Sequence, residues 1–600
     1  NDDGPDPWNR LINKLLADPR YGEHWARFWL DLVRYAESDG WNKDSYRPNI
    51  WRYRDYVVKS FNEDKPYPAF VQEQLAGDEL PGDDPDQLVA TGFLRLGIYE
   101  YNQRDARSHW NDIMNEMTDV TGDVFLGVSM SCSRCHNHKF DPIPQTDYFG
   151  LRAFFEPLIW HDDIPGATQA AQATHDAQQR NWEVATREIR DEIDSLCQPY
   201  YRKKWDDTVD KFPLDIQECF NKAPEERTSW EHQMAMLVVR QFYEEGTPAL
   251  SSMKAEDKEH LDFLNRQLGT YDSMKPKAMP AVMSVRDFNG TLSPTFIPAR
   301  EDQPVEPRFL SVLSVDETPV PATLPDSSGR RTALAEWIGR DNNPLTTRLI
   351  VNRIWQQHFG RGIVTSANDF GRLGEEPTHP QLLDWLTQNF VENGWQMKNF
   401  HKMILMSAVW QQASYHPEAK ANLEKDPAGR LLWRAQSRRL KAEEIRDSML
   451  CVTGELDGRL GGPSVKADVP KRALYVQSHR NSPDALMQLF DAANGLTSVA
   501  QRNNTVTPTQ ALLMMNGDYA LARARALAAR LIHEDHARPE AAIARAFRLA
   551  WGRDGTRAER ARATAYVTAA SDATSSSLNE KRLGDFCHIL FNANEFFYVD

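Results

Sequence analysis

The apolar residues of this 600-residue chain recur at spacings of three and four over most of its length, which is the pattern of a buried helix face. Near the start, two such faces are formed by Leu11, Ile12, Leu15 and Leu16, and then by Trp25, Phe28, Trp29, Leu32 and Tyr35. The same spacing predicts helices at 51–61, 69–76, 111–128 and 147–155. We therefore expect a helical domain at 1–164.

The pattern changes twice in the middle of the chain. Residues 165–278 carry a narrow apolar stripe on highly charged helices, which predicts a helical insertion or hairpin; the stripe is formed by Trp182, Ile189, Ile193 and Leu196. From 279 to 328 prolines recur and helical spacing is lost, so a partly extended, proline-rich linker is expected. Within it, 281–288 reads as a short strand and 318–325 as an extended segment.

From 329 to 600 helical spacing returns. It predicts a helix from Asn343-Pro344 to Gly360 and further helices at 382–390, 400–410, 442–452, 512–515, 520–531, 541–549 and 582–591, with a strand at 474–477. The predicted fold class is therefore mainly α, with two helical domains joined by the helical insertion and the linker.

The bulk composition narrows the class of protein. The chain has a formal net charge of −16 and is 41% hydrophobic, which argues against nucleic acid as a partner. No apolar run reaches the ~18 residues that a membrane span requires. Six cysteines in 600 residues exclude a disulfide-stapled scaffold.

The motif with the clearest chemistry is Cys132-Ser133-Arg134-Cys135-His136. C-x-x-C-H is the attachment signature of a c-type haem. Its two thiols, Cys132 and Cys135, add to the porphyrin, and His136 is then the axial ligand of the iron. We therefore expect one covalent haem c. Such haems are attached outside the bacterial cytoplasmic membrane, so a periplasmic or otherwise exported protein and a targeting segment not included in this sequence are expected.

Two other interpretations of the same motif stay open. C-x-x-C is half of many zinc sites, and His138 could supply a third ligand, although no second C-x-x-C is present. The two thiols could also form a redox-active dithiol.

Long motifs in matching order resemble the planctomycete cytochrome-type proteins, in which a planctomycete-specific cytochrome domain of the second type and a planctomycete-specific domain, both of uncharacterised function, lie in tandem. In the first domain these motifs are Tyr21-Gly22-Glu23, Arg34-Tyr35, Asp39-Gly40, Tyr53-Arg54-Asp55, Glu73-Gln74-Leu75-Ala76-Gly77-Asp78 and the haem loop up to Asp147-Tyr148. In the second they are Asn343-Pro344-Leu345, Asn352-Arg353-Ile354-Trp355, His358-Phe359-Gly360, Asp369-Phe370-Gly371, His379-Pro380, Arg438-Arg439-Leu440, Glu443, Arg446-Asp447, His479-Arg480, Phe490-Asp491, Arg502-Asn503-Asn504-Thr505 and Asn594-Glu595-Phe596.

The resemblance implies an exported protein associated with polysaccharide breakdown. Many family members carry an additional amino-terminal cytochrome module, which this chain lacks, so a separate redox partner is expected to exchange electrons with it. The same association makes a carbohydrate the expected substrate, and the candidate arginines described next point to an anionic one.

Several polar residues are candidates for substrate chemistry. Guanidinium groups match carboxylate and sulfate with paired hydrogen bonds, which makes Arg439, Arg446 and Arg502 candidate substrate-binding residues. The candidate acid–base or positioning residues are His138, His358, His379, His479 and Arg480. For each, a structural role is the alternative: buried ion pairs for the arginines and satisfied core positions for the histidines. Asp39, Asn42 and Asp44 have a spacing that resembles a calcium loop only faintly.

Two functions from different classes remain. The first is a monohaem c-type oxidoreductase that acts on a carbohydrate in a cleft between the haem domain and the second domain. The second is a non-catalytic electron-transfer or scaffold cytochrome that docks a partner enzyme or glycan. A zinc-dependent hydrolase is a third interpretation, tied to the zinc reading of the motif. We favour the oxidoreductase, because the chain is far larger than the ~100 residues a small domain needs.

Overall fold

The computed structural model describes residues 6–101, 103–246, 249–298, 300–314, 317, 319–321, 324–535, 538–569 and 579–599. It confirms the mainly α fold class, because helices dominate and the strands pair only in two-stranded sheets in this part of the chain. Residues 318, 322 and 323 of the expected extended segment at 318–325 lie outside the described residues. None of the described helices is long and apolar enough to cross a membrane.

The chain divides into two compact units. Unit 1 consists of residues 1–18, 354–362 and 401–600, and unit 2 consists of residues 19–353 and 363–400. These units differ from the boundaries expected from sequence, because residues 329–353 and 363–400, which we expected to begin the second domain, belong to the same unit as residues 19–164.

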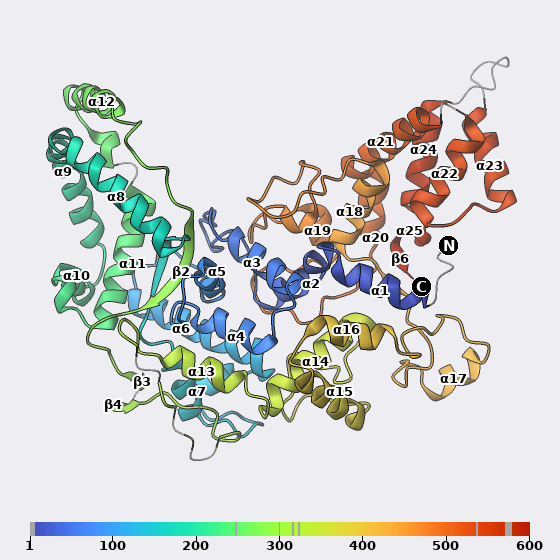
Figure 1. Cartoon of the computed structure of the whole chain (residues 1–600), viewed down its shortest axis with the longest axis horizontal. Helices are drawn as coiled ribbons and strands as arrows, with labels where there is room; N and C mark the ends of the chain where they lie inside the picture. Colours follow the sequence, from blue (N-terminus) through green and yellow to red (C-terminus); the bar gives the residue numbers. More distant parts are fainter. Residues whose placement is uncertain are drawn as a thin grey trace. The chain divides into compact units, whose positions relative to one another are not determined.

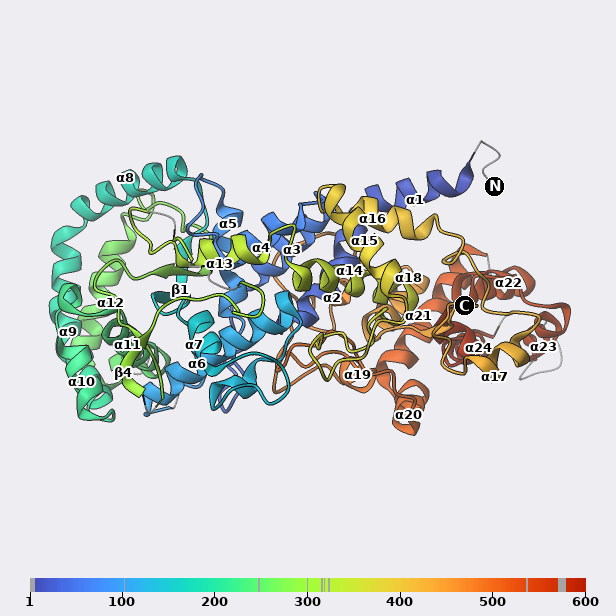
Figure 2. The ribbon, with the colours of Figure 1, turned by 90° about the horizontal axis from the view of Figure 1, so that it is seen from below.

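The described elements of unit 2 are mostly helices, which alternate with short 3-10 turns, one π-helical turn (η2) and four strands. They are α2 (Arg20–Leu32), α3 (Trp51–Asn62), α4 (Tyr67–Ala76), α5 (Pro85–Ala90), η1 (Thr91–Arg95), α6 (Ala106–Thr121), η2 (Gly122–Leu126), η3 (Ser131–Arg134), α7 (Gln145–Arg152), β1 (Leu158–Pro165), α8 (Gln169–Ala185), α9 (Arg187–Val209), α10 (Leu214–Asn221), η4 (Pro224–Glu226), α11 (Ser229–Gly246), η5 (Ala249–Ser252), α12 (Ala255–Gly269), β2 (Ala281–Asp287), β3 (Thr295–Ile297), β4 (Arg300–Val305), α13 (Arg330–Ile338) and α15 (Pro380–Glu392). Within this unit, α8 to α12 gather in one helical lobe (Figures 1 and 2).

Unit 1 is built mainly from carboxy-terminal helices, and α21 to α24 lie side by side in it (Figure 2). Its elements are α1 (Pro7–Ala17), α17 (Ala419–Lys425), β5 (Arg438–Arg439), α18 (Ala442–Thr453), η6 (Ala473–Tyr475), α19 (Ala485–Leu489), α20 (Pro508–Asn516), α21 (Asp518–Glu534), α22 (Pro539–Trp551), α23 (Arg557–Thr568), α24 (Glu580–Phe591), α25 (Asn594–Phe597) and β6 (Tyr598–Val599). Two further helices, α14 (Pro344–Phe359) and α16 (Met397–Leu405), contain the residues at which the division falls.

The described residues form three antiparallel strand pairs, of which β1–β2 and β5–β6 join segments distant in sequence and β3–β4 joins neighbouring segments. The strand expected at 281–288 is confirmed as β2, which pairs with β1; β3 pairs with β4, and β5 pairs with β6. The strand expected at 474–477 is wrong. Ala473–Tyr475 forms the 3-10 turn η6, and only Val476 makes an isolated bridge, to Val465. The N–H of Ala473 bonds to the Asp447 carboxylate instead of a neighbouring strand.

Helices α2 and α3 approach each other closely because Gly22 has no side chain. A Cβ atom at Gly22 would lie 2.3 Å from the carbonyl oxygen of Val58, and the Gly22 N–H donates to Asn62 Oδ1 at 2.9 Å. The same core is joined by polar atoms: Trp29 Nε1 donates to Tyr53 Oη at 3.1 Å and to Gln74 Oε1 at 3.0 Å. This packing supports the helices on which the site described below depends.

We expect Gly22→Ala to destabilise the protein by about 1–3 kcal/mol, because the added methyl group overlaps the backbone of α3. Urea unfolding measures the effect. Gly584→Ala is the matched control: this glycine is also inside a helix, but its nearest neighbour would be 4.0 Å from the new Cβ, so unchanged or higher stability is expected. Equal stabilities of the two variants would contradict the close approach of α2 and α3.

Helix α6 delivers the chain to the C-x-x-C-H motif. The Asp105 carboxylate caps its first turn by accepting from Ser108 N at 3.1 Å, and Trp110, Ile113 and Met117 are buried on its inner face. The helix continues as a π-helical turn, η2, of the kind that often occurs at functional sites. Gly127 ends this turn at φ 64°, a left-handed conformation that glycine adopts without strain.

Candidate functional site

The C-x-x-C-H motif forms a loop whose two thiols face the solvent. Ser131–Arg134 is a 3-10 turn, and Cys132 and Cys135 are exposed and not joined in a disulfide. Between them Ser133 is buried, where its N–H donates to Met130 O at 2.8 Å and its hydroxyl to Ile143 O at 3.3 Å. The inward Ser133 therefore turns both thiols outward and anchors the loop to the chain that follows it.

His136 is held in the tautomer that an iron ligand requires. Its ring is exposed, and Nδ1 lies 2.6 Å from the carbonyl oxygen of Asn137. A carbonyl oxygen only accepts, so Nδ1 carries the proton and Nε2 keeps its lone pair. Metal-bound histidines commonly donate their second ring N–H to a backbone carbonyl in this way.

His138 instead closes the loop. Its side chain is 8% exposed, and its Nδ1 accepts the N–H of Asp141 at 2.9 Å, which leaves the proton of the neutral ring on Nε2. The Asp141 carboxylate lies 3.2 Å from the same Nδ1, a contact that would become an ion pair only if the ring were protonated. The His138 N–H donates to Ile143 O at 2.8 Å, so His138 is fixed at both ends.

Two further side chains hold the loop in place. Arg134 forms an ion pair with Asp119 of α6. Gln145, the first residue of α7, donates through Nε2 to Arg134 O at 2.9 Å, and its N–H donates to Asn137 Oδ1 at 2.9 Å. The motif is thus held between α6 and α7, as expected from sequence.

The residues of this loop fit haem attachment better than the alternatives. A porphyrin supplies four nitrogen ligands itself, so His136 is a sufficient protein ligand on one face. Zinc needs three or more protein ligands, and the described residues contain no group of three His, Cys, Asp or Glu side chains that could hold a metal ion. A redox dithiol would not require the adjacent, correctly protonated imidazole.

The residues near the motif in sequence that could bind the opposite face of the iron are buried elsewhere. Met114, Met117 and Met130 are at most 1% exposed, and His109 is 9% exposed. The His109 ring packs 4.9 Å from the Tyr99 ring, and burial, followed by Arg240, lowers the pKa of His109 to about 4. None of these four side chains is exposed beside the thiols.

The other candidate histidines have contacts of their own within their units. In unit 1, His358 Nε2 lies 2.9 Å from His401 Nδ1, and burial lowers the pKa of His358 to about 4, so its ring is neutral at physiological pH. His479 is half-buried in the same unit. His379, in unit 2, precedes α15 and contacts the Thr378 hydroxyl at 3.0 Å. The described contacts do not bring these rings together.

The candidate arginines all have protein partners, which supports the structural role left open for them. Arg502 forms a two-bond pair with Glu443 at 2.7 and 2.7 Å. Arg439 pairs with Asp491 at 2.7 Å. Arg446 donates to three backbone carbonyls at 2.7–3.0 Å. Arg480 donates through Nε to Gly495 O at 2.8 Å. The guanidinium groups of these arginines therefore donate to carboxylates and carbonyl oxygens of the protein itself.

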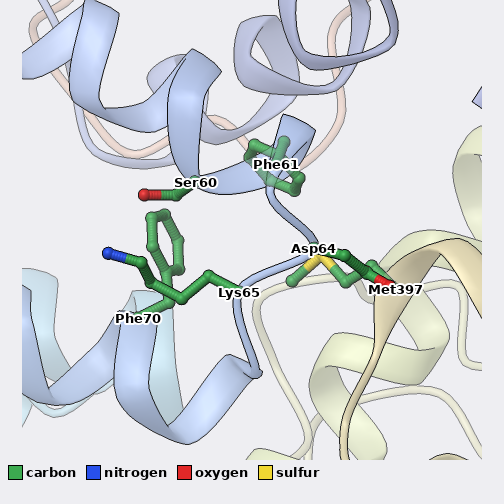
Figure 3. A pocket seen from close by; sticks show the side chains of 6 residues that line it. All are labelled: Ser60, Phe61, Asp64, Lys65, Phe70 and Met397. Atoms are coloured by element: carbon green, nitrogen blue, oxygen red, sulfur yellow. The ribbon is translucent and has the colours of Figure 1, made fainter. Parts of the chain in front are cut away.

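Among the cavities enclosed by described residues, two lie outside the motif. One, of about 130 Å³ in unit 1, is lined in part by Arg446, Asp484 and Tyr519. The other, in unit 2, has about 10 Å³, room for no more than about one water molecule. Figure 3 shows its six lining side chains, which come from α3, the turn after it, α4 and α16.

Sequence reasoning missed one contact at the site. The Arg372 N–H donates to Asp141 Oδ1 at 2.6 Å, across 231 residues of sequence. Asp141 belongs to the haem loop, and Arg372 directly follows the motif Asp369-Phe370-Gly371, but no pattern in the sequence paired the two segments. Almost every residue has a backbone N–H, so residue types do not show which carboxylate such a group reaches. Only the structure shows this contact.

Two family models match the chain. PSCyt2, a protein of unknown function (DUF1549), matches residues 1–159, and PSD1, a protein of unknown function (DUF1553), matches residues 330–567. No curated protein and no solved structure matches it. The order of the two matches is the tandem order that the sequence motifs indicated. The chain therefore belongs to the planctomycete cytochrome-type family in which a PSCyt2 domain is followed by a PSD1 domain.

Proposed function

We propose that this chain is an exported monohaem c-type cytochrome that exchanges electrons at the Cys132–His136 loop. The observation that carries the proposal is the pairing of two exposed thiols with an exposed imidazole whose Nδ1 proton is held by the Asn137 carbonyl. The haem would supply one-electron oxidation and reduction.

The residues of the chain have separate parts in this proposal. Cys132 and Cys135 would hold the porphyrin covalently, and His136 would bind the iron through Nε2. The Asn137 carbonyl orients the imidazole and raises its basicity by accepting the Nδ1 proton. His138 keeps the loop closed through Asp141 and Ile143. Because the thiols are at the surface, a separate redox partner could approach the haem edge directly.

Oxidation of a carbohydrate is the second candidate function. The observation in its favour is an exposed aromatic ring beside the motif: Phe140 is 42% exposed, with the Lys139 ammonium 5.2 Å from the ring centre. Such a ring can pack against the apolar face of a sugar, and the adjacent cation would suit an anionic one. Against this, the inward-directed Arg439, Arg446 and Arg502 leave no preformed anion site at those positions.

The test is the absorption spectrum of full-length protein exported in a host that attaches c-type haem. We expect an α-band in the reduced protein and a mass increment of one haem per chain. A low-spin spectrum that cyanide, carbon monoxide and peroxide leave unchanged would favour electron transfer alone. A high-spin spectrum that they alter, with haem reduction on adding acidic oligosaccharides, would favour carbohydrate oxidation. Colourless protein of unmodified mass would end both proposals.

A further inference from the structure

A tight turn of the PSD1 region contacts the haem-attachment loop on both sides. We call residues 369–374 the clamp turn. On one side, its Phe370 N–H donates to Gly127 O at 2.8 Å, ahead of Cys132 in the chain. On the other, its Arg372 N–H donates to Asp141 Oδ1 at 2.6 Å, beyond His136. The clamp turn therefore bridges the two ends of the segment that carries Cys132, Cys135 and His136.

The clamp turn is rigid in itself. The Gly371 N–H donates to Asp369 Oδ1 at 2.9 Å, and the Gly374 N–H donates to Gly371 O at 3.0 Å. The residue before the turn is also anchored, because Asn368 Oδ1 accepts from Arg353 Nη2 at 2.8 Å. Arg353 is 5% exposed and donates as well to the carbonyl oxygens of Asp123 and Val124 in η2. The turn is thus tied to the same π-helical turn that leads into the motif.

Gly371 permits the contact with Asp141. A Cβ atom at Gly371 would lie 2.5 Å from Asp141 Oδ2, 2.7 Å from Oδ1 and 2.8 Å from Cγ. All three distances are shorter than real Cβ contacts, so any side chain here would displace the carboxylate. The Asp141 side chain is 10% exposed and is bordered by His138 on its other side, so little free space remains for it to move into.

Displacement of Asp141 would also move His136, because hydrogen bonds of the loop connect the two residues. The Asp141 N–H holds His138 Nδ1, and the Asp141 carbonyl accepts the N–H of Ile143 at 2.8 Å. His138 directly follows Asn137, whose carbonyl orients His136. Groups that orient a metal ligand change metal affinity or activity by about 10–100-fold when they are removed.

We propose that the clamp turn of the PSD1 region fixes the haem-attachment loop, and that Asp141 and Gly371 are positioning residues for His136. The part of the inference that concerns His136 rests on the proposed haem function. It gives a physical role to the tandem of the two family domains: the second domain supplies a turn that sets the geometry of the first domain's redox site.

Hydrogen–deuterium exchange of the full-length chain tests the clamp without reference to haem. In Gly371→Ala and Asp141→Ala, the peptide spanning 137–146 is expected to exchange roughly five- to thirtyfold faster, as expected when one hydrogen bond to a charged acceptor is lost. Asp141→Asn retains an acceptor for the Arg372 N–H and should stay near wild type. Gly269→Ala is the control, because its new Cβ would meet nothing closer than 3.9 Å. Exchange within twofold of wild type in both Gly371→Ala and Asp141→Ala would overturn the clamp.

The reduction potential of the haem-loaded variants tests the positioning of His136. We expect Gly371→Ala to shift the potential while the thermal midpoint of the protein stays near that of Gly269→Ala. A lower thermal midpoint with an unchanged potential would overturn the positioning role and leave only a structural contact. If the purified chain carried no haem, the proposed function would fail, and the exchange experiment would still support or overturn the clamp by itself.

Discussion

Replacing Cys132 and Cys135 together by alanine is expected to abolish covalent haem binding. On the proposed haem attachment, one haem per chain should fall to none, because both thioether bonds would be lost and His136 alone would hold the iron by one coordinate bond. Mass spectrometry of the denatured protein and the reduced absorption spectrum measure this. His136→Ala should keep the covalent mass increment but change the absorption spectrum, since it would remove the proposed iron ligand and keep both thiols.

Cys451→Ala is the matched control for the thiol variants. Cys451 is also exposed, but it stands outside any C-x-x-C-H sequence, so this variant should keep the full haem mass and spectrum. A double variant of Cys132 and Cys135 that still carried covalent haem would show that the motif is not the attachment site. A loss of haem in Cys451→Ala would contradict the assignment in the same way.

The sequence could predict those parts of this protein that are specified by residues close together in the chain. Five consecutive residues contain both thiols and the imidazole, and helical spacing is visible within fifteen residues, so the motif and most helices followed from pattern alone. The pairing of β1 with β2 joins Leu158 to Asp287, and no local pattern specifies that partner. The expected strand at 474–477 is wrong because the N–H groups of Tyr475 and Val476 bond locally, to Arg472 O and Ala473 O, and not to a neighbouring strand.

The candidate arginines show why residue type alone does not define a binding site. Arg446 resembles an anion-binding residue in the sequence, yet in the structure it donates to the carbonyl oxygens of Ala467, Val469 and Lys471. Backbone acceptors are present at every position of a chain, so only the fold shows which of them a guanidinium reaches. The same reason explains why the contact between Arg372 and Asp141 required the structure.

The second large effect, on the free energy of unfolding, is expected at Arg331. In a buried cluster with Asp78, Glu79 and Asp287, it is the only cation among the described ion pairs. Its guanidinium donates to both Asp78 oxygens at 2.6 and 2.7 Å and to Asp287 at 2.9 Å, with Glu79 at 3.2 Å. All four side chains are at most 4% exposed. Arg331→Met would leave buried carboxylates uncompensated, so we expect a loss of about 3–5 kcal/mol in the free energy of unfolding.

The same variant should show a characteristic pH dependence. Burial opposes ionisation of Asp287, but the charge of Arg331 together with hydrogen bonds from Arg331 and Ser328 outweighs it and lowers the pKa of Asp287 below its ordinary value. Burial raises the pKa of Glu79, and Arg331 opposes this shift. Wild-type protein therefore loses the contribution of Asp287 as pH falls through the acidic range. Without Arg331, burial raises the carboxyl pKa values, and the folded variant takes up protons. The difference in free energy of unfolding between wild type and Arg331→Met should therefore decrease as the pH falls from 7 towards about 4.

Urea unfolding at several pH values, followed by circular dichroism, measures both effects, and Arg459→Met provides the control. Arg459 also pairs with a carboxylate, Asp457, at 2.7 Å, but its side chain is 86% exposed, so its loss should leave the free energy of unfolding close to that of wild type. Arg331→Lys keeps the charge without the two-bond fork and should fall between wild type and Arg331→Met. If Arg331→Met were no less stable than Arg459→Met, the carboxylates around Arg331 would have to be solvated in the folded protein. The ion pairs that join α13 to the segment after α4 and to β2 would then not exist.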